Sequence, residues 1–196
     1  MMKTMRALLV LVALTAVAQA QAPGEVAPTG PSVMARRWAV SVALGAESMT
    51  AKTDDAKPVG FGALELAGRF RIRPAIEVSL AFSAAGNQGI GTAGFYVEGR
   101  YRFLAERPWS PFAGLSLGVA SVADKTGNDT EKKGRGALRL SGGIERRIGN
   151  FGIEAALRLV GIAENKDVMT VMTAGQRLSR YGVSGGELAI GASYYF

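Results

Sequence analysis

Glutamate and arginine are the residues best able to do chemistry in this chain of 196 residues, because histidine and cysteine are both absent. A Ser-His-Asp triad, a cysteine nucleophile and a zinc site with His or Cys ligands are therefore excluded. Paired carboxylates remain as candidate general acids and bases, but they alternate in the sequence with arginines, which favours structural ion pairs. We expect a protein that is not an enzyme and that has no cofactor and no metal.

The glutamates and arginines occur at alternate positions, and apolar residues fill the positions between them. Around Glu65 and Arg69, for example, Leu64, Leu66 and Phe70 lie on the opposite face. A period of two residues is that of a β-strand. This pattern predicts eight strands, at 38–45, 64–70, 76–82, 95–103, 114–119, 138–145, 153–159 and 187–196.

The polar face of these strands has a composition that suits an enclosed space. After residue 20, every lysine and every aspartate falls in a predicted loop, whereas the strands use glutamate and arginine. Alternation alone also fits a soluble sheet whose polar face meets water. Arginine favours a closed interior, because its planar fork binds carboxylates bidentately. The interior ion pairs that we predict, six glutamates and six arginines, involve Glu65, Arg69, Arg71, Glu77, Glu98, Arg100, Arg102, Arg139, Glu145, Glu154, Arg158 and Glu187.

These patterns predict an all-β fold, an eight-stranded antiparallel up-and-down transmembrane β-barrel. The apolar faces extend over about 9 to 11 residues, which is the length of a tilted strand that crosses a membrane. The connections alternate between short and long, as in transmembrane barrels. Eight strands enclose a lumen only just wide enough for side chains to fill. We therefore expect a packed interior without a continuous water channel.

The N-terminal part has the features of a segment that directs secretion. Residues 1–20 combine Lys3 and Arg6, an apolar run over 7–14 and a small-residue ending at Ala20, which predicts a cleaved signal peptide. Residues 21–36 are rich in Pro, Gly and Ala and are expected to form a flexible periplasmic leader. The barrel is predicted to occupy residues 37–196. The expected location is the cell outer membrane, reached by secretion through the inner membrane.

The C-terminal residues resemble a known assembly signal. Tyr194 and Phe196 lie on the apolar face of the last predicted strand. This ending is similar to the signature that the outer-membrane barrel assembly machinery reads. With the aromatic-Gly-x-x-x-Gly pattern within 111–118, the chain resembles the small outer-membrane barrels of the OmpA/OmpX type over 37–196. The resemblance covers the barrel domain alone and implies the assembly machinery as a partner. Because the predicted barrel leaves no room for the periplasmic peptidoglycan-binding domain of full OmpA proteins, that activity is not expected here.

One glycine motif has a misleading likeness to a nucleotide-binding sequence. Gly89, Gly91 and Gly94 match GxGxxG. That motif needs a strand before it and a helix after it, whereas a strand pattern follows here. A tight hairpin loop is predicted instead.

The basic character of the chain suggests its partners. The formal net charge of +7 falls to +5 when Lys3 and Arg6 leave with the signal peptide. In a secreted protein, this positive excess favours acidic lipid head groups or acidic surface sugars over nucleic acid. We expect contact with outer-membrane lipid and lipopolysaccharide, with Lys132, Lys133 and Arg135 of the predicted loop as candidate phosphate donors. The apolar segment 168–173 is a candidate docking edge. No surface ligand is identified by these patterns.

Three functional hypotheses follow from this sequence. The favoured one is a structural, surface-display or adhesion-type barrel that is not catalytic. The second is a narrow-channel protein for small solutes, similar to a porin. The third is a periplasmic barrel that binds a lipid-like ligand, in which case the apolar face would point inward.

Overall fold

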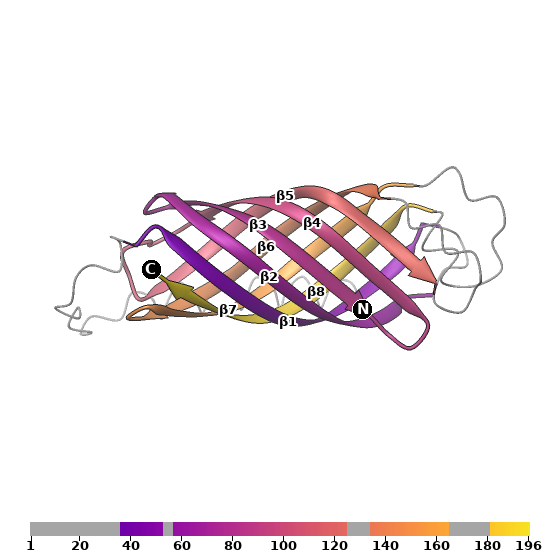
Figure 1. Cartoon of the computed structure of the whole chain (residues 1–196), viewed down its shortest axis with the longest axis horizontal. Helices are drawn as coiled ribbons and strands as arrows, with labels where there is room; N and C mark the ends of the chain where they lie inside the picture. Colours follow the sequence, from indigo (N-terminus) through magenta and orange to yellow (C-terminus); the bar gives the residue numbers. More distant parts are fainter. Residues whose placement is uncertain (1–35, 53–56, 125–133, 165–180) are drawn as a thin grey trace, which may run out of the picture. The chain divides into compact units, whose positions relative to one another are not determined.

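The structure is a computed structural model that describes residues 36–52, 57–124, 134–164 and 181–196. Eight strands in these ranges pair antiparallel in chain order, and β8 pairs back with β1, so the sheet closes into a barrel (Figure 1). Among the described residues, no helix is long and apolar enough to cross a membrane. The predicted fold class is confirmed. The strands are β1 (Trp38–Ala51), β2 (Val59–Arg73), β3 (Ile76–Gly86), β4 (Ile90–Arg102), β5 (Trp109–Asp124), β6 (Arg135–Ile148), β7 (Phe151–Ile162) and β8 (Val183–Tyr195).

Short turns join the strands at one end of the barrel, which we call the turn end. The β6–β7 connection is a two-residue turn, in which Gly149 has a φ of 60°. Glycine adopts this left-handed conformation without steric cost, and two-residue hairpins with a positive φ at the first central residue match the twist of the strands. The amide of Phe196 donates to the carbonyl of Trp38 at 2.9 Å. Both ends of the barrel domain therefore lie at the turn end.

The other connections leave from the opposite end, which we call the loop end. Residues 1–35, and with them the predicted signal and leader, lie outside the described part of the chain, as does the candidate docking edge at 168–173. The β3–β4 connection is described, and it is short. The side chain of Asn87 accepts hydrogen bonds from the amides of Gly89 and Ile90. The predicted hairpin loop is thus limited to 87–89, and Gly91 and Gly94 belong to β4.

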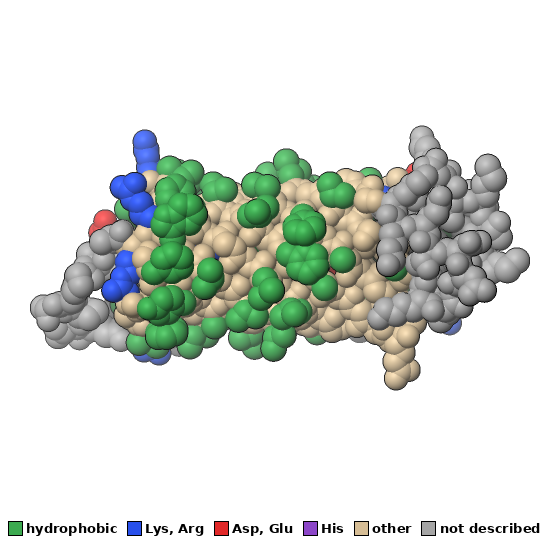
Figure 2. Space-filling model, viewed as in Figure 1, with side chains coloured by type: hydrophobic (Ala, Val, Ile, Leu, Met, Phe, Trp, Pro, Cys, Tyr) green, Lys and Arg blue, Asp and Glu red, His purple; other side chains and the backbone are tan. Residues whose placement is uncertain are grey.

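The outer face of the barrel carries a belt of large apolar side chains over the part next to the turn end. Leu44, Leu80 and Leu159 are exposed by 66%, 61% and 65% of their surface. Figure 2 shows hydrophobic side chains distributed over the barrel wall on the visible face. Lipid is the environment in which such a wall is stable, and closure of the barrel leaves no unpaired strand edge facing it. The apolar face thus points outward, which contradicts the third hypothesis.

Near the loop end, the two faces of the strands exchange their chemistry. The outward positions there carry small side chains and glycines, which are exposed: Ala46, Ser48, Gly60, Gly62, Gly136 and Ser184. The inward positions carry a buried apolar cluster. We call this the apolar cluster, and it includes Met49, Phe61, Ile90, Val122, Val160, Ile162 and Val183. This end of the barrel is therefore built like a soluble protein, with an apolar inside.

This exchange explains why the predicted strands are too short. Strand β1 was expected to end at Gly45 and continues to Ala51, and β2 was expected to begin at Leu64 and begins at Val59. Prediction followed apolar residues on one face and polar residues on the other, and this pattern reverses near the loop end. The reversed segments were consequently left out of the predicted strands.

Candidate functional site

The inside of the barrel is lined with charged side chains. Among the described residues, seven glutamates and eight arginines are buried. The structure places all the predicted interior glutamates and arginines within this set, and it adds Glu47, Arg135 and Arg147. Because Glu47 and Arg135 lie in the reversed strand segments and Arg147 was assigned to a turn, the predicted balance of six and six omitted them. The lumen is the part of the molecule in which polar groups converge.

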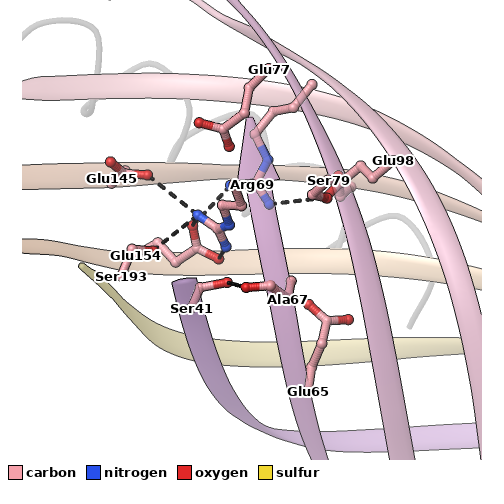
Figure 3. Close-up of polar contacts among 12 residues, drawn as sticks. Ser41, Glu65, Ala67, Arg69, Glu77, Ser79, Glu98, Glu145, Glu154 and Ser193 are labelled. Atoms are coloured by element: carbon pink, nitrogen blue, oxygen red, sulfur yellow. Dashed lines mark hydrogen bonds and ion pairs between the residues drawn. The ribbon is translucent and has the colours of Figure 1, made fainter. Parts of the chain in front are cut away.

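Arg69 on β2 lies at the centre of the largest group of ion pairs. Its Nη1 and Nη2 atoms donate to Oε2 and Oε1 of Glu154 on β7, at 2.9 and 2.8 Å. Its Nη1 also donates to the hydroxyl of Ser193 at 3.1 Å and lies 3.7 Å from Oε2 of Glu145. Figure 3 shows Arg69 pointing into the lumen between Glu145, Glu154 and Ser193.

The same group extends toward the middle of the barrel. Arg100 donates from Nη1 to Oε2 of Glu154 at 2.9 Å, and from Nη2 to Oε2 of Glu98 at 3.2 Å. The hydroxyl of Ser141 donates to the other oxygen of Glu98 at 2.6 Å. These contacts connect β4 with β6 and β7, so that walls separated in the sheet are joined through the lumen.

At the turn end, the group continues around Glu145, whose side chain is completely buried. This carboxylate accepts hydrogen bonds from Nη2 of Arg102 at 2.7 Å, Nε of Arg147 at 2.7 Å and the hydroxyl of Tyr195 at 2.8 Å. Arg102 also binds Glu77, at 2.9 Å. These donors stabilise the buried carboxylate, whereas burial of an unpaired carboxylate would cost roughly several kcal/mol.

A second group of ion pairs lies nearer the loop end. Glu65 on β2 accepts from Nη1 of Arg139 at 2.6 Å and from Nη2 of Arg158 at 2.8 Å. Arg158 binds Glu187 through its Nη1 atom at 3.0 Å. Arg139 also donates to the hydroxyl of Ser83 at 2.8 Å. This group crosses the lumen from β2 to β6 and β7.

Aromatic rings lie between the two charged groups and at their ends. The guanidinium of Arg139 lies 3.8 Å from the ring centre of Tyr96, and that of Arg100 lies 4.0 Å from the ring centre of Phe112. Arg71 lies 5.0 Å from the ring of Tyr195. Cations stack favourably on aromatic faces. The rings therefore fill space while they also stabilise the charges.

Glu47 is the exception in this arrangement. It is only 7% exposed, and its carboxylate makes no ion pair or hydrogen bond with any residue in the described part of the chain. In the β1–β8 register, it is directly opposite Glu187. Next along its face comes Met49 of the apolar cluster. Glu47 thus marks the boundary between the charged lumen and the apolar cluster.

The residues predicted to contact the surface have mixed outcomes. Lys132 and Lys133 lie outside the described residues. Arg135 is buried, and its Nη1 atom donates to the carbonyls of Ala163 and Tyr181, both at 3.1 Å. The prediction that Arg135 is an exposed phosphate donor is wrong. Its role in the structure is to hold the ends of β6, β7 and β8 together at the loop end.

The side chains of Tyr194 and Phe196 point outward, as the sequence pattern predicted. Tyr194 and Phe196 are on the outer face, exposed by 41% and 60%. The ring of Tyr194 packs against that of Phe151 with 5.2 Å between centres. Tyr195 points inward and joins the group around Glu145. Recognition of these residues by the assembly machinery stays a prediction.

The chemistry of the lumen is that of a packed interior. Apart from Glu47, each buried glutamate is paired with arginine, and burial separates these groups from solvent. Among the described residues, no group of three acidic side chains could hold a metal ion. A pocket of about 340 Å³ at the loop end is lined by Lys52, Ile162, Ala163, Glu164, Tyr181 and Gly182. It borders the apolar cluster through Ile162, and none of its lining residues belongs to the two groups of ion pairs.

No protein-family model matches the sequence, and no curated protein is similar to it in sequence. Solved structures are similar in fold. Neisserial surface protein A matches over 81% of this chain and 99% of its own, with 16% identity and a TM-score of 0.63. The N-terminal β-barrel domain of OprF from Pseudomonas aeruginosa matches over 80% of this chain and 97% of its own, with 11% identity and a TM-score of 0.51.

A third similar structure is the outer membrane protein AlkL, determined in lipid bilayers. It matches over 90% of this chain and 97% of its own, with 12% identity and a TM-score of 0.51. The closed antiparallel barrel of eight strands agrees with this likeness. The chain therefore has the fold of the small eight-stranded outer-membrane β-barrels of the OmpA/OmpX-like type.

Proposed function

We propose that this protein is a barrel of the outer membrane with a structural, surface-display or adhesion-type role, and that its lumen neither conducts solutes nor catalyses a reaction. The observation that carries the proposal is the filling of the lumen. Two groups of ion pairs cross it, and each joins strands that are not neighbours in the sheet. A solute that passed through would have to separate these buried pairs, which is costly.

The apolar cluster adds a second obstacle at the loop end. Met49, Phe61 and Val160 are each at most 5% exposed and point into the lumen. An ion that moved between the ion pairs and the loop end would have to cross this apolar layer without compensating partners. A barrel whose lumen is filled by ion pairs and by an apolar cluster is suited to anchoring the segments displayed at its ends rather than to transporting solutes.

Recording from planar bilayers tests the absence of conduction. We expect the purified protein to give no stable single-channel steps. The matched comparison is a variant in which Met49, Phe61 and Val160 are all replaced by alanine, against one with Leu44, Leu66 and Leu159 replaced by alanine on the outer face. Stable steps from the unaltered protein would instead support the narrow-channel function.

Display at the cell surface is tested by labelling. The chain has no cysteine, so single cysteines introduced at Lys52 or Glu164 near the loop end report their own accessibility. We expect a membrane-impermeant maleimide to label them on intact cells and to leave a cysteine at Arg73, at the turn end, unlabelled. The reverse pattern would mean that the loops face the periplasm and would refute surface display.

A further inference from the structure

Exposed arginines gather at the turn end of the barrel. Arg37 precedes β1, Arg73 ends β2, Arg107 lies in the β4–β5 turn and Arg146 is on the outer face of β6, and all are exposed. Glu106 is the exposed acidic residue that accompanies them in the described part of this end. Figure 2 shows the basic side chains, in blue, at the end of the barrel where Figure 1 places the C-terminus. We call these four residues the arginine rim.

Most of the arginine rim is not neutralised within the protein. Arg37, Arg73 and Arg146 make no ion pair with any residue that the structure describes. In the lumen, by contrast, ion pairs with glutamates are made by Arg69, Arg100, Arg102, Arg139, Arg147 and Arg158. At the loop end the described exposed charges are Lys52 and Lys57 with Glu164, which leaves a smaller positive surplus than four arginines with Glu106 at the turn end. Among the described residues, the excess of exposed positive charge is thus larger at the turn end than at the loop end.

The arginine rim borders a ring of aromatic side chains on the outer face of the barrel. Trp38 packs against Phe70 with 4.6 Å between ring centres, and Tyr101 against Phe103 with 5.0 Å. The guanidinium of Arg146 lies 5.1 Å from the ring centre of Trp109. Aromatic girdles occupy the level of the head groups in transmembrane barrels. The exposed arginines therefore lie at the level of lipid phosphates.

We propose that the arginine rim is a binding surface for anionic phospholipids, of the phosphatidylglycerol class, in the leaflet that faces the turn end. Arginine forms bidentate, charge-assisted hydrogen bonds with phosphate oxygens. Basic residues near a membrane surface attract anionic head groups, and the attraction falls off within a Debye length. The four arginines come from separate strands and turns, so they surround a large part of the barrel. This surface does not depend on whether the lumen conducts.

The two tryptophans of the chain provide the experiment. Trp38 follows Arg37 directly, and Trp109 lies under Arg146, so that intrinsic fluorescence reports on lipids at the arginine rim. The folded protein is placed in phosphatidylcholine vesicles that contain either brominated phosphatidylglycerol or brominated phosphatidylcholine at equal mole fraction. We expect stronger quenching by phosphatidylglycerol, with a local preference of about fivefold for each arginine that binds a head group.

Substitutions and salt identify the cause of the preference. Replacing Arg37, Arg73 and Arg146 by glutamine should make quenching by the two lipids equal, while quenching by phosphatidylcholine itself stays unchanged because the tryptophans keep their depth. The control, Lys52→Gln with Lys57→Gln, should keep the preference. High salt should reduce the preference in the unaltered protein, which keeps the test valid if the triple variant fails to fold. Equal quenching in the unaltered protein, or a preference that survives the triple substitution, would overturn the proposal.

Discussion

Arg69 and Glu154 form two parallel contacts across the lumen, with Nη1 to Oε2 at 2.9 Å and Nη2 to Oε1 at 2.8 Å. They lie on β2 and β7, which are not neighbours in the barrel. The pair therefore connects walls that the backbone hydrogen bonds of the sheet do not connect directly. Both side chains are buried. If one of them is removed, water therefore cannot take its place beside the other.

The first prediction concerns this pair. Arg69→Met and Glu154→Gln should each lower the free energy of unfolding by about 3–5 kcal/mol, because each removes one charge from a buried group of ion pairs and leaves the opposite charge only partly compensated, by Arg100 or by Glu145. The double substitution should cost less than the sum of the two, with a coupling of about 0.5–3 kcal/mol. Unfolding by urea in lipid vesicles measures these values. Lys57→Gln, exposed near the loop end, is the control and should change the free energy by less than about 0.5 kcal/mol.

The second prediction contrasts two buried glutamates. Glu145 accepts hydrogen bonds from Arg102, Arg147 and Tyr195, so Glu145→Gln should lower the free energy of unfolding by about 3–5 kcal/mol. Glu47 is buried opposite Glu187 without a partner among the described residues. Glu47→Gln removes an unpaired charge and should be neutral or stabilising, when measured in the same urea unfolding. A large loss of stability from Glu47→Gln would show that this carboxylate has a stabilising role.

Much of the fold was predictable because the membrane imposes a simple pattern. Within the lipid belt, outward positions are large and apolar and inward positions are charged or small, so alternation alone identified the strands and their faces. Glu65 and Arg139, for example, were assigned to the interior from sequence, and the structure places them 2.6 Å apart across the lumen. Which glutamate binds which arginine was not predictable, because partners such as Arg69 and Glu154 are brought together only by closure of the barrel.

The loop end could not be predicted by the same pattern. There Met49 and Phe61 point inward while Ser48 and Gly60 point outward, and this arrangement reverses the rule that holds in lipid. Glu47 and Arg135 were missed as interior residues for this reason. A search for apolar alternation that changes face within one strand would have found the extensions of β1 and β2.

The third prediction uses glycines on the two faces of the barrel wall. A Cβ atom at Gly114 would collide with the carboxylate of Glu98 and the hydroxyl of Ser141, which bind each other at 2.6 Å. Gly114→Val should therefore lower the free energy of unfolding by about 1–3 kcal/mol through overpacking. Gly99→Val is the matched control, because Gly99 faces outward with nothing within 4 Å of its Cβ position. If both variants unfold at the same urea concentration, the lumen around Glu98 is less tightly packed than the structure indicates.

The fourth prediction locates the edge of the lipid belt on the loop side. Leu44 and Ser48 both lie on the outer face of β1, with Ala46 between them on that face, and both are exposed. Lysine facing lipid costs about 2–4 kcal/mol at the middle of the bilayer and about 0–1 kcal/mol near its interfaces. Leu44→Lys should therefore be strongly destabilising in vesicles, while Ser48→Lys should have little effect, because the small outer residues and the apolar cluster inside indicate that this level lies beyond the hydrocarbon. Folding of both variants in detergent without added lipid separates the lipid contribution from that of strand pairing. Equal costs at the two positions in vesicles would mean that the hydrocarbon extends to the end of β1 and that the apolar cluster lies within the membrane.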